Sequence, residues 1–232
     1  CQELPFLVAL WGRLGPLTCQ FKGGGLDKPI AIRPQKTPAG EGDRYAGLAL
    51  LDSQIEIRGC TLQGLGTGIL VLGANSAPLL KGNLCRANSQ SGILFRAGAT
   101  GTAEVNVCTE NKPSGIAAQD GRTAPVIRKN QCQKNPGSGI AFADGTGGVA
   151  EENVCDGNTG CGIQVSGQGT APVIRSNQCR TNEQHGIGFS GGAGGTAETN
   201  VCEKNANAGL LAQGRGTAPM LRKNRSRGNK LH

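Results

Sequence analysis

The chain has few aromatic residues, no long apolar run and no helix-forming stretch. Only seven of its 232 residues are aromatic, which excludes a core built on aromatic side chains. The best apolar stretch, from Pro5 to Trp11, is interrupted at Gly12 and Arg13. It falls short of the ~18 residues needed to cross a bilayer, so we expect no transmembrane segment. Apolar residues still make up 37% of the chain and recur at fixed places, which argues against disorder.

A short motif, Asn-x-Cys-x-x-Asn, recurs every 23 or 24 residues. Its six copies are centred on Cys85, Cys108, Cys132, Cys155, Cys179 and Cys202. A seventh copy has Ser226 in place of the cysteine, between Asn224 and Asn229. An Ile or Leu stands eight residues beyond each cysteine, and Cys60 with Ile69 extends the register back to about residue 46. The chain is therefore a repeat protein.

A period near 23 residues predicts a parallel β-helix. Two-helix repeats need 33 or more residues, and a leucine-rich repeat needs more leucines and a helical return. Short segments broken by Gly, Asn and Pro are typical of β-strands and turns. We predict an all-β fold of about eight to nine right-handed coils, each with three strands and three turns, stacked ~4.8 Å apart. Residues 1–27 are predicted to form an N-terminal cap, residues 28–229 the β-helix and residues 230–232 a C-terminal tail.

Stacking explains why the same residues recur. The two asparagines of each motif would form columns in which side-chain amides donate up the stack and accept from below, and asparagine also tolerates a left-handed turn. Two inward columns alternate large and small side chains, so the true unit is a pair of coils of 47 residues. These columns are Leu80, Ala103, Ile127, Ala150, Ile174, Ala197 and Leu221, and Phe95, Ala118, Phe142, Val165, Phe189 and Ala212.

One outward column alternates in charge from coil to coil. Its members stand four residues before each motif cysteine, or before Ser226, and we interpret them as an ionic network that sets the register. They are Lys81, Glu104, Arg128, Glu151, Arg175, Glu198 and Arg222.

Seven of the ten cysteines, counting Cys60, are assigned to one stacked column. A thiol packs there as a small apolar group, and we expect these cysteines to be reduced. Buried free thiols favour a reducing, cytoplasmic compartment. Cys1 and Cys19 lie in the irregular N-terminal segment, where they are candidates for a disulfide.

The combination of Gly-Ile, Ala-Pro-Val-Ile-Arg and Asn-x-Cys-x-x-Asn resembles the pectin-lyase-like family of right-handed β-helix repeats. The resemblance covers roughly residues 46 to 229. It implies membership of a group that includes carbohydrate-binding and sugar-hydrolysing modules, alginate epimerases and β-helix domains that only bind partners. The motifs specify a fold better than an activity, so function must be argued from a site.

In two columns the residue type changes between equivalent positions of successive coils, and these positions supply candidate catalytic residues. In the first, Cys161 stands next to His185, and a thiol beside an imidazole can become a nucleophile. In the second, Asp120 and Asp144 follow each other on consecutive coils with Arg122 nearby. Stacked carboxylates can share a proton or a cation, as paired carboxylates do in sugar-cleaving enzymes. Turn variation and ordinary Asp-Gly turns are the structural alternatives.

The outward positions around the Gly-Ile strand are small or neutral, without the row of charged residues expected of a lyase or hydrolase on this fold. Such a strip suits a sugar chain or a protein face and argues against cleavage of a polysaccharide. The residues are Ala117, Gln119, Ala141, Ala143, Gln164, Ser166, Gly188, Ser190 and Gln213.

Positive charge gathers at the C-terminal end without any acidic residue. The formal charge of +8 favours an acidic partner, either protein or polysaccharide. Nucleic acid is disfavoured because the outward positions lack aromatic residues on which bases could stack. The predicted partner-binding residues are Arg222, Lys223, Arg225, Arg227 and Lys230.

The sequence favours a non-catalytic β-helix scaffold that docks a protein or polysaccharide partner, as a subunit of a larger assembly. No cofactor or metal is predicted. The alternative is a carbohydrate-active lyase, hydrolase or epimerase acting on an acidic polysaccharide through Asp120, Asp144 and Arg122. A third hypothesis is homotypic assembly through the basic end, since an open solenoid terminus can pair with another copy.

Overall fold

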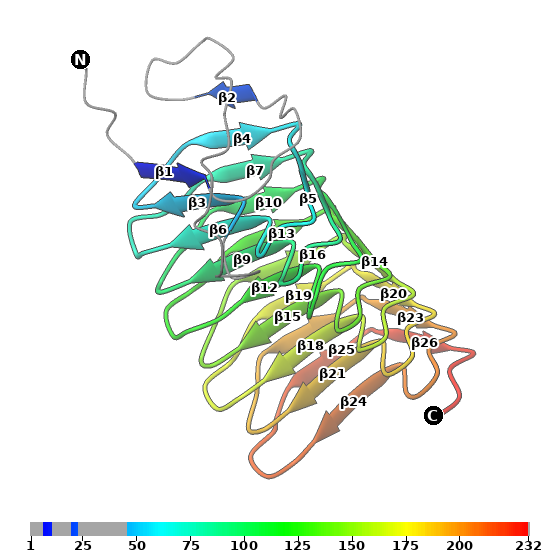
Figure 1. The fold of residues 1–232 in the computed structure, drawn as a ribbon. Coiled ribbons are helices and arrows are strands. Elements are labelled where there is room, and N and C mark those ends of the chain that lie inside the picture. Colours follow the sequence, from blue (N-terminus) through cyan, green and yellow to red (C-terminus); the bar gives the residue numbers. More distant parts are fainter. Residues whose placement is uncertain (1–6, 11–19, 23–45, 232) are drawn as a thin grey trace, which may run out of the picture.

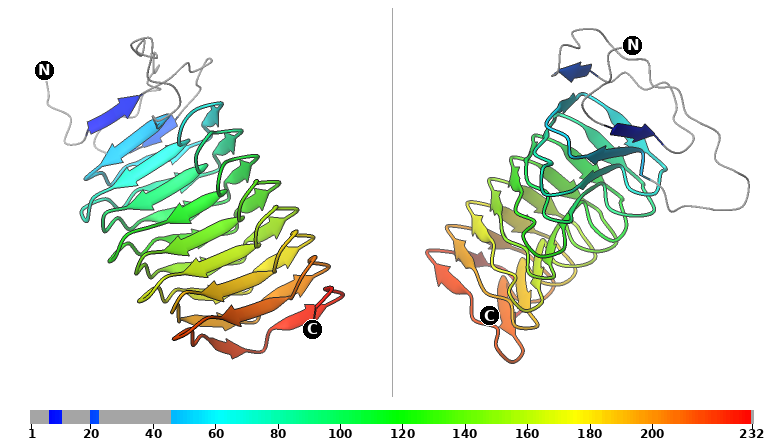
Figure 2. Two further views of the ribbon diagram at one scale, coloured as in Figure 1. Left: turned by 60° about the horizontal axis from the view of Figure 1, so that its bottom comes forward. Right: turned by 90° about the vertical axis from the view of Figure 1, so that its left-hand side faces the viewer.

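The structure is a computed structural model that describes residues 7–10, 20–22 and 46–231. Every element of this part of the chain is a β-strand, and the strands form three sheets that run the length of a solenoid (Figure 1). Each coil contributes one strand to each sheet (Figure 2). The prediction of an all-β solenoid is confirmed, with about eight coils. No helix that could cross a membrane occurs in the described ranges.

The first sheet holds the Gly-Ile segments. Its strands are β1 (Leu7–Leu10), β3 (Leu48–Leu51), β6 (Ile69–Leu72), β9 (Ile93–Arg96), β12 (Ile116–Ala118), β15 (Ile140–Ala143), β18 (Ile163–Ser166), β21 (Ile187–Ser190) and β24 (Leu210–Gln213).

The second sheet carries the alternating charges. Its strands are β2 (Gln20–Lys22), β4 (Glu56–Arg58), β7 (Leu79–Lys81), β10 (Thr102–Glu104), β13 (Val126–Arg128), β16 (Val149–Glu151), β19 (Val173–Arg175), β22 (Thr196–Glu198) and β25 (Met220–Arg222).

The third sheet carries the cysteine motif. Its strands are β5 (Thr61–Gln63), β8 (Leu84–Arg86), β11 (Val107–Thr109), β14 (Gln131–Gln133), β17 (Val154–Asp156), β20 (Gln178–Arg180), β23 (Val201–Glu203) and β26 (Arg225–Arg227).

From β3 onward every strand pairs in parallel with its equivalent one coil away, and from Cys85 onward the register agrees with the sequence alignment. Cys108 lies between Cys85 and Cys132, and Ala150 lies between Ile127 and Ile174. The alternation of large and small inward residues is therefore real, and these columns are fully buried through most of the stack. Phe95, Phe142 and Phe189 are among the largest fully buried side chains.

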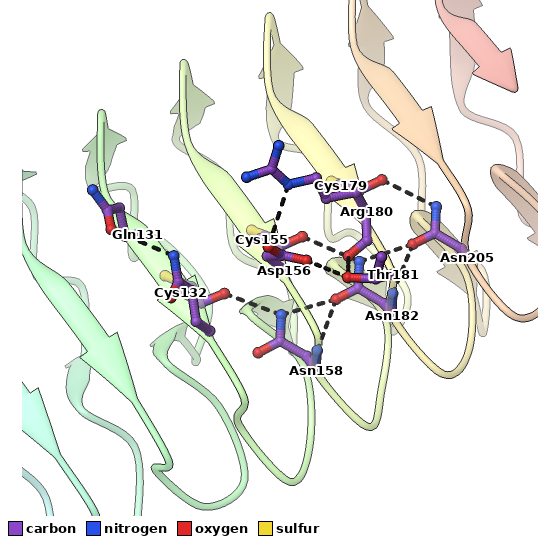
Figure 3. A network of polar contacts seen from close by, with 11 residues as sticks. Gln131, Cys132, Cys155, Asp156, Asn158, Cys179, Arg180, Thr181, Asn182 and Asn205 are labelled. Carbon is purple, nitrogen blue, oxygen red and sulfur yellow. Dashed lines mark hydrogen bonds and ion pairs between the residues drawn. The ribbon is translucent and has the colours of Figure 1, made fainter.

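The two asparagine columns form continuous hydrogen-bonded ladders. The Nδ2 and the backbone N–H of Asn106 both donate to Oδ1 of Asn130, at 2.9 and 2.8 Å. The same Nδ2 also donates to the carbonyl of Leu80 in the coil below, at 2.9 Å. Figure 3 shows this pattern in the second ladder, where Asn158 donates to Asn182 and to the carbonyl of Cys132. Each amide thus satisfies buried polar groups on both sides, as predicted.

The left-handed turn residue is the one before each asparagine and not the asparagine itself. The seven positions that precede the first ladder include Val105 at φ 56°, Lys129 at 56° and Thr199 at 56°, with Gly82 at 63°. The tolerance of asparagine for the left-handed conformation is therefore not used at the ladder positions, where its hydrogen bonds explain its recurrence.

Cys60 does not belong to the cysteine column. Leu62 pairs with Cys85, so Leu62 begins that column, whereas the N–H of Cys60 donates to Oδ1 of Asn83 at 2.9 Å. Cys60 therefore occupies an asparagine-ladder position, and the sequence alignment was two residues out at this point. The six column members from Cys85 to Cys202 are free and buried, whereas Cys60 is disulfide-bonded. The expectation of reduced thiols holds for the column and fails at Cys60.

The N-terminal end of the solenoid is closed by two antiparallel strands. β1 pairs with β3 and β2 pairs with β4, both antiparallel, so the first parallel coil has a partner on each of these edges. Both strands lie within the predicted capping segment, most of which falls outside the described residues, as do Cys1 and Cys19. At the other end, Leu231 of the predicted tail still bridges in parallel to Ala208.

Candidate functional site

Charged residues along the middle of the solenoid neutralise one another in pairs. The carboxylate of Glu104 lies 3.5 Å from Nζ of Lys81 and 3.2 Å from Nη2 of Arg128. Partial burial raises the pKa of Glu104, but the hydrogen bond and charge of Arg128, with Lys81, outweigh it and lower the pKa overall. Farther along, Nε of Arg175 donates to Glu151 at 2.8 Å. Among the described residues, the alternating column is thus paired between adjacent coils from Lys81 to Arg128 and from Glu151 to Arg175.

The third sheet repeats this compensation. Nε of Arg86 lies 3.3 Å from Glu110, and Nε of Arg180 lies 3.3 Å from Asp156, whose carboxylate also accepts from Thr181 (Figure 3). Exposed pairs of this kind contribute only about 0 to 1 kcal/mol each. Their larger effect is to leave little unpaired charge on these faces.

The cations of the last coil do not follow this pattern of paired charges. Beyond Glu203 no acidic residue occurs up to residue 231, while the chain carries the five predicted partner-binding residues together with Lys204 and Arg215. Within the described part of the chain, none of these cations lies within 4.0 Å of a carboxylate. Arg222 and Arg227 stand directly next to Glu198 and Glu203 in the register, yet form no ion pair with them. Positive charge therefore outweighs negative charge at this end, where Glu198 and Glu203 are the neighbouring acids in the register.

The same coil exposes inward positions that are buried everywhere else. Leu221 continues the column of Ile174 and Ala197, and its exposed fraction is 48% against 0% for both of them. Ala212 and Ser226 are likewise exposed, although they continue the columns of buried Phe189 and Cys202. The C-terminal end of the described solenoid is open, whereas Leu48, Ile57 and Leu62 at the other end are fully buried. In Figure 1 the open coil is the red end of the stack.

Polar ladders also end here with unused donors. The backbone N–H of each earlier ladder asparagine donates to the next Oδ1, as Asn200 does to Asn224 at 3.0 Å. For Asn224 and Asn229, the described residues provide no next Oδ1 for the backbone N–H.

A pocket of about 290 Å³, lined by Glu203, Lys204, Arg227 and Gly228, opens beside the end of the third sheet. Charge, apolar surface and unpaired strand edges therefore coincide in one place, which we call the basic edge (β24, β25 and β26).

The Cys161 and His185 pair is stacked but not joined through the two side chains. Sγ of Cys161 lies 3.1 Å from Oε1 of Gln164 and 3.7 Å from Oε1 of Gln184. Nδ1 of His185 instead accepts from the N–H of Ala208 at 3.2 Å. Burial raises the pKa of the Cys161 thiol and lowers the pKa of His185, so both groups are neutral near pH 7. No activated thiolate results from this arrangement.

The Asp120 and Asp144 pair lies at the edge of the first sheet, at left-handed turn positions. Asp120 is held by Nε of Arg96 at 3.1 Å and by the N–H of Ala97 at 3.2 Å. The hydrogen bond from Arg96 lowers the pKa of Asp120, which is the opposite of the change that suits a general acid. In the part of the chain that the structure describes, Arg122 forms no ion pair with Asp120. Arg96, which lies one coil before Asp120, was not predicted from the sequence as the partner of this carboxylate.

The outer face of the first sheet is less open than the sequence indicated. Ala117 is 2% exposed and Leu94 is 9% exposed, although both point away from the core. Nearer the C-terminal end, Nε2 of Gln164 donates to Oγ of Ser190 at 3.1 Å. Among the described residues, no group of three or more His, Cys, Asp or Glu side chains could hold a metal ion.

Comparisons with known proteins agree with this architecture. The family model described as "Right handed beta helix region" matches residues 41–171 and 115–230. The comparison with curated protein sequences gave no match. Similar solved structures include the periplasmic alginate epimerase AlgG, with a TM-score of 0.60 at 14% identity over 71% of this chain and 48% of that one.

A second similar structure is the A-module of the Azotobacter vinelandii mannuronan C-5 epimerase AlgE4. Its TM-score is 0.54 at 18% identity, over 73% of this chain and 55% of that module. The chain spans about half the length of these structures, and identities this low show the fold alone. The predicted handedness and the resemblance to pectin-lyase-like proteins are confirmed. The chain belongs to the family of right-handed parallel β-helix proteins.

Proposed function

We propose that this protein is a non-catalytic binding module that docks an anionic macromolecule at the basic edge. The observation that supports it is the contrast between paired charge along the solenoid and unpaired positive charge on its last coil. A cluster of unpaired cations attracts an anionic partner over about a Debye length. The exposed Leu221, and strand edges that have no partner among the described residues, would offer such a partner apolar contacts and hydrogen bonds as well.

Three of the five candidate catalytic residues support a binding role because each is engaged with another group or buried. Asp120 pairs with Arg96, His185 accepts from a backbone N–H, and Cys161 is a buried neutral thiol. Catalysis of proton transfer requires a group whose pKa is near the working pH and which can reach the substrate. Their arrangement provides no such pair.

Binding to two polyanions, sodium alginate and polyglutamate, tests this proposal. We expect binding that weakens with salt and falls at least tenfold in the triple variant Arg222→Gln, Arg225→Gln, Arg227→Gln. The matched control, Lys112→Gln, Lys129→Gln, Lys134→Gln, removes the same charge from exposed positions elsewhere and should bind almost as well as the unaltered protein. Equal losses in both variants would contradict a defined site.

The second candidate is a carbohydrate-active module acting on an acidic polysaccharide. It is favoured by the structural similarity to two proteins named as alginate epimerases. Incubation with alginate or pectate, followed by NMR of uronate composition and chain length, separates the two proposals. We expect no change in the polymer. Turnover that disappears in Asp120→Ala would establish the carbohydrate-active alternative.

A further inference from the structure

Among the cysteines that the structure describes, Cys60 alone is disulfide-bonded. The six column members and Cys161 are free. The chain has ten cysteines, and the two that remain are Cys1 and Cys19, which lie in the N-terminal segment outside the described residues. These two are therefore the candidate partners of Cys60, and a bond to either one ties the N-terminal segment to the first coils.

Burial protects the free thiols from the same oxidation. The six column members are fully buried, and Cys161 is 1% exposed. The neighbouring Cys108 thiol and then burial raise the pKa of the Cys85 thiol, and burial raises the pKa of Cys161. A neutral, covered thiol is a poor nucleophile in thiol–disulfide exchange. Reduced thiols in the column and an oxidised Cys60 are therefore compatible in one molecule.

The place of Cys60 in the register favours Cys19 as its partner. Strand β2 pairs antiparallel with β4, with Gln20 opposite Arg58. Cys60 follows Arg58 by two residues, and its Sγ lies 3.7 Å from the Arg58 carbonyl oxygen. Cys19 directly precedes Gln20 in the sequence. Continued by one residue, this register would set Cys19 beside the neighbour of Cys60, within the Cα separation of about 4.4 to 6.8 Å that a disulfide needs.

Cys1 is the less direct partner. It precedes β1, which pairs with β3 on the first sheet, with Leu7 opposite Leu51. Cys60 follows β4, which belongs to the second sheet. A bond from Cys1 would have to cross from one sheet to the other within the six residues before Leu7, which span at most ~20 Å.

We propose that Cys19 and Cys60 form a disulfide that fastens β2 to the first coil and keeps the N-terminal end of the solenoid closed. β2 has only three residues, and it pairs with β4 over three register positions. So short a strand pair is marginal without further support. The disulfide keeps the two strands near each other whenever their hydrogen bonds open, so the edge of β4 and the buried Ile57 stay covered.

The bond forms by exchange with a protein or small-molecule disulfide. The S–S bond of that donor breaks, the S–S bond between Cys19 and Cys60 forms, and the donor leaves as two thiols that carry the two protons. Such donors prevail in oxidising compartments. The disulfide thus assigns the protein to an oxidising compartment, in place of the reducing one expected from the column thiols. It lies at the opposite end from the basic edge and is independent of the binding proposed there.

Peptide mapping without reduction tests the pairing. Trypsin places Cys1, Cys19 and Cys60 in three different peptides, residues 1–13, 14–22 and 59–81. The full chain is produced in an oxidising compartment of the expression host, and its free thiols are alkylated under denaturing conditions before digestion. We expect a disulfide-linked pair of peptides 14–22 and 59–81, with the column cysteines and Cys161 alkylated.

Hydrogen–deuterium exchange tests what the bond does. In Cys19→Ser, residues 20–22 and 56–58 should exchange faster by about tenfold or more, because β2 detaches more often from β4. Reduction of the unaltered protein should have the same effect without any substitution. The matched control, Cys1→Ser, should exchange like the unaltered protein. Residues 93–190 should exchange equally in every sample, which shows that the β-helix stays folded.

Four outcomes would overturn the inference. A link between peptides 1–13 and 59–81, or between 1–13 and 14–22, assigns the bond to another pair. Alkylated Cys60 in protein from the oxidising compartment removes the bond. Unchanged exchange at residues 56–58 in Cys19→Ser removes its role in closing the end. Polyanion binding at the basic edge should be the same in all these variants, so that failure of the disulfide and failure of the proposed function remain distinct.

Discussion

At the residue scale, the strongest local conflict lies between side-chain type and backbone conformation in the turns before the first ladder. Val105 is β-branched, 49% exposed and held at φ 56°, where L-residues other than glycine, asparagine and aspartate are rare. Gly82 occupies the equivalent position one coil earlier. The ladder asparagines on both sides fix this turn through buried hydrogen bonds.

Replacing Val105 by glycine should therefore stabilise the protein. The left-handed conformation costs an L-residue about 1 to 2 kcal/mol, and the flexibility of glycine in the unfolded chain offsets part of the gain. We expect a net gain of about 0.5 to 1 kcal/mol in urea unfolding. The same change at Val173, which is exposed but lies within strand β19, should destabilise. A loss of stability in Val105→Gly would show that the turn is unstrained.

Asn130 is a test of the ladder itself. Asn130→Ala removes two donated hydrogen bonds and leaves the buried N–H and Nδ2 of Asn106 without their acceptor. Each unsatisfied buried group costs about 1 to 3 kcal/mol, so we expect a loss of about 3 kcal/mol in the free energy of unfolding. Asn224→Ala, at the half-buried last position, should cost about 1 kcal/mol. Equal losses at the two positions would contradict a cooperative ladder.

At the element scale, each strand of the second sheet is defined by its neighbours above and below. Ile127 lies next to Ala150 in the register, and both are fully buried. The two side chains share one layer of core volume, so their sizes are expected to be coupled. A change in side-chain volume at one position should therefore alter the packing at the other position.

A double-mutant cycle measures this coupling. Ile127→Ala should cost about 2 to 5 kcal/mol through the cavity it leaves, and Ala150→Ile about 1 to 3 kcal/mol through crowding. The double variant should lose less than the sum, by about 1 kcal/mol or more. The control pair Ile127→Ala with Ala197→Ile is not in direct register and should be additive. Additivity in the first pair would contradict the alternating core.

The sequence repeat predicted most of the strands because residues that recur at a fixed spacing lie directly above one another in a β-helix. The cysteine, asparagine and charge columns could be aligned from Cys85 to Arg222 by spacing alone. Cys60 was misplaced because the first described coils have Leu62 and Leu65 where later coils have Cys and Asn, so the motif gives no signal there. The left-handed residues were missed because Val, Lys, Glu, Ser and Thr at these positions have no preference for the left-handed conformation.

At the scale of the whole molecule, the two ends differ in covering and in charge. The N-terminal end has antiparallel partners for β3 and β4, and the C-terminal end presents an open basic coil. The run of cations at residues 222–230 was readable from the sequence. The contrast between these cations and the paired charges of the earlier coils could not be read from the sequence, because the ion pairs of Arg86, Arg96 and Arg180 join residues 24 positions apart. The structure therefore adds a reason to propose this end as the partner-binding site.

Hydrogen–deuterium exchange with and without polyglutamate tests the central claim most directly. If the basic edge is the docking site, protection on binding should be confined to residues 210–231, where the strand edges have no partner among the described residues. It should disappear in the Arg222→Gln, Arg225→Gln, Arg227→Gln variant. Protection spread over residues 93–190 of the first sheet, with residues 210–231 unchanged, would contradict the account.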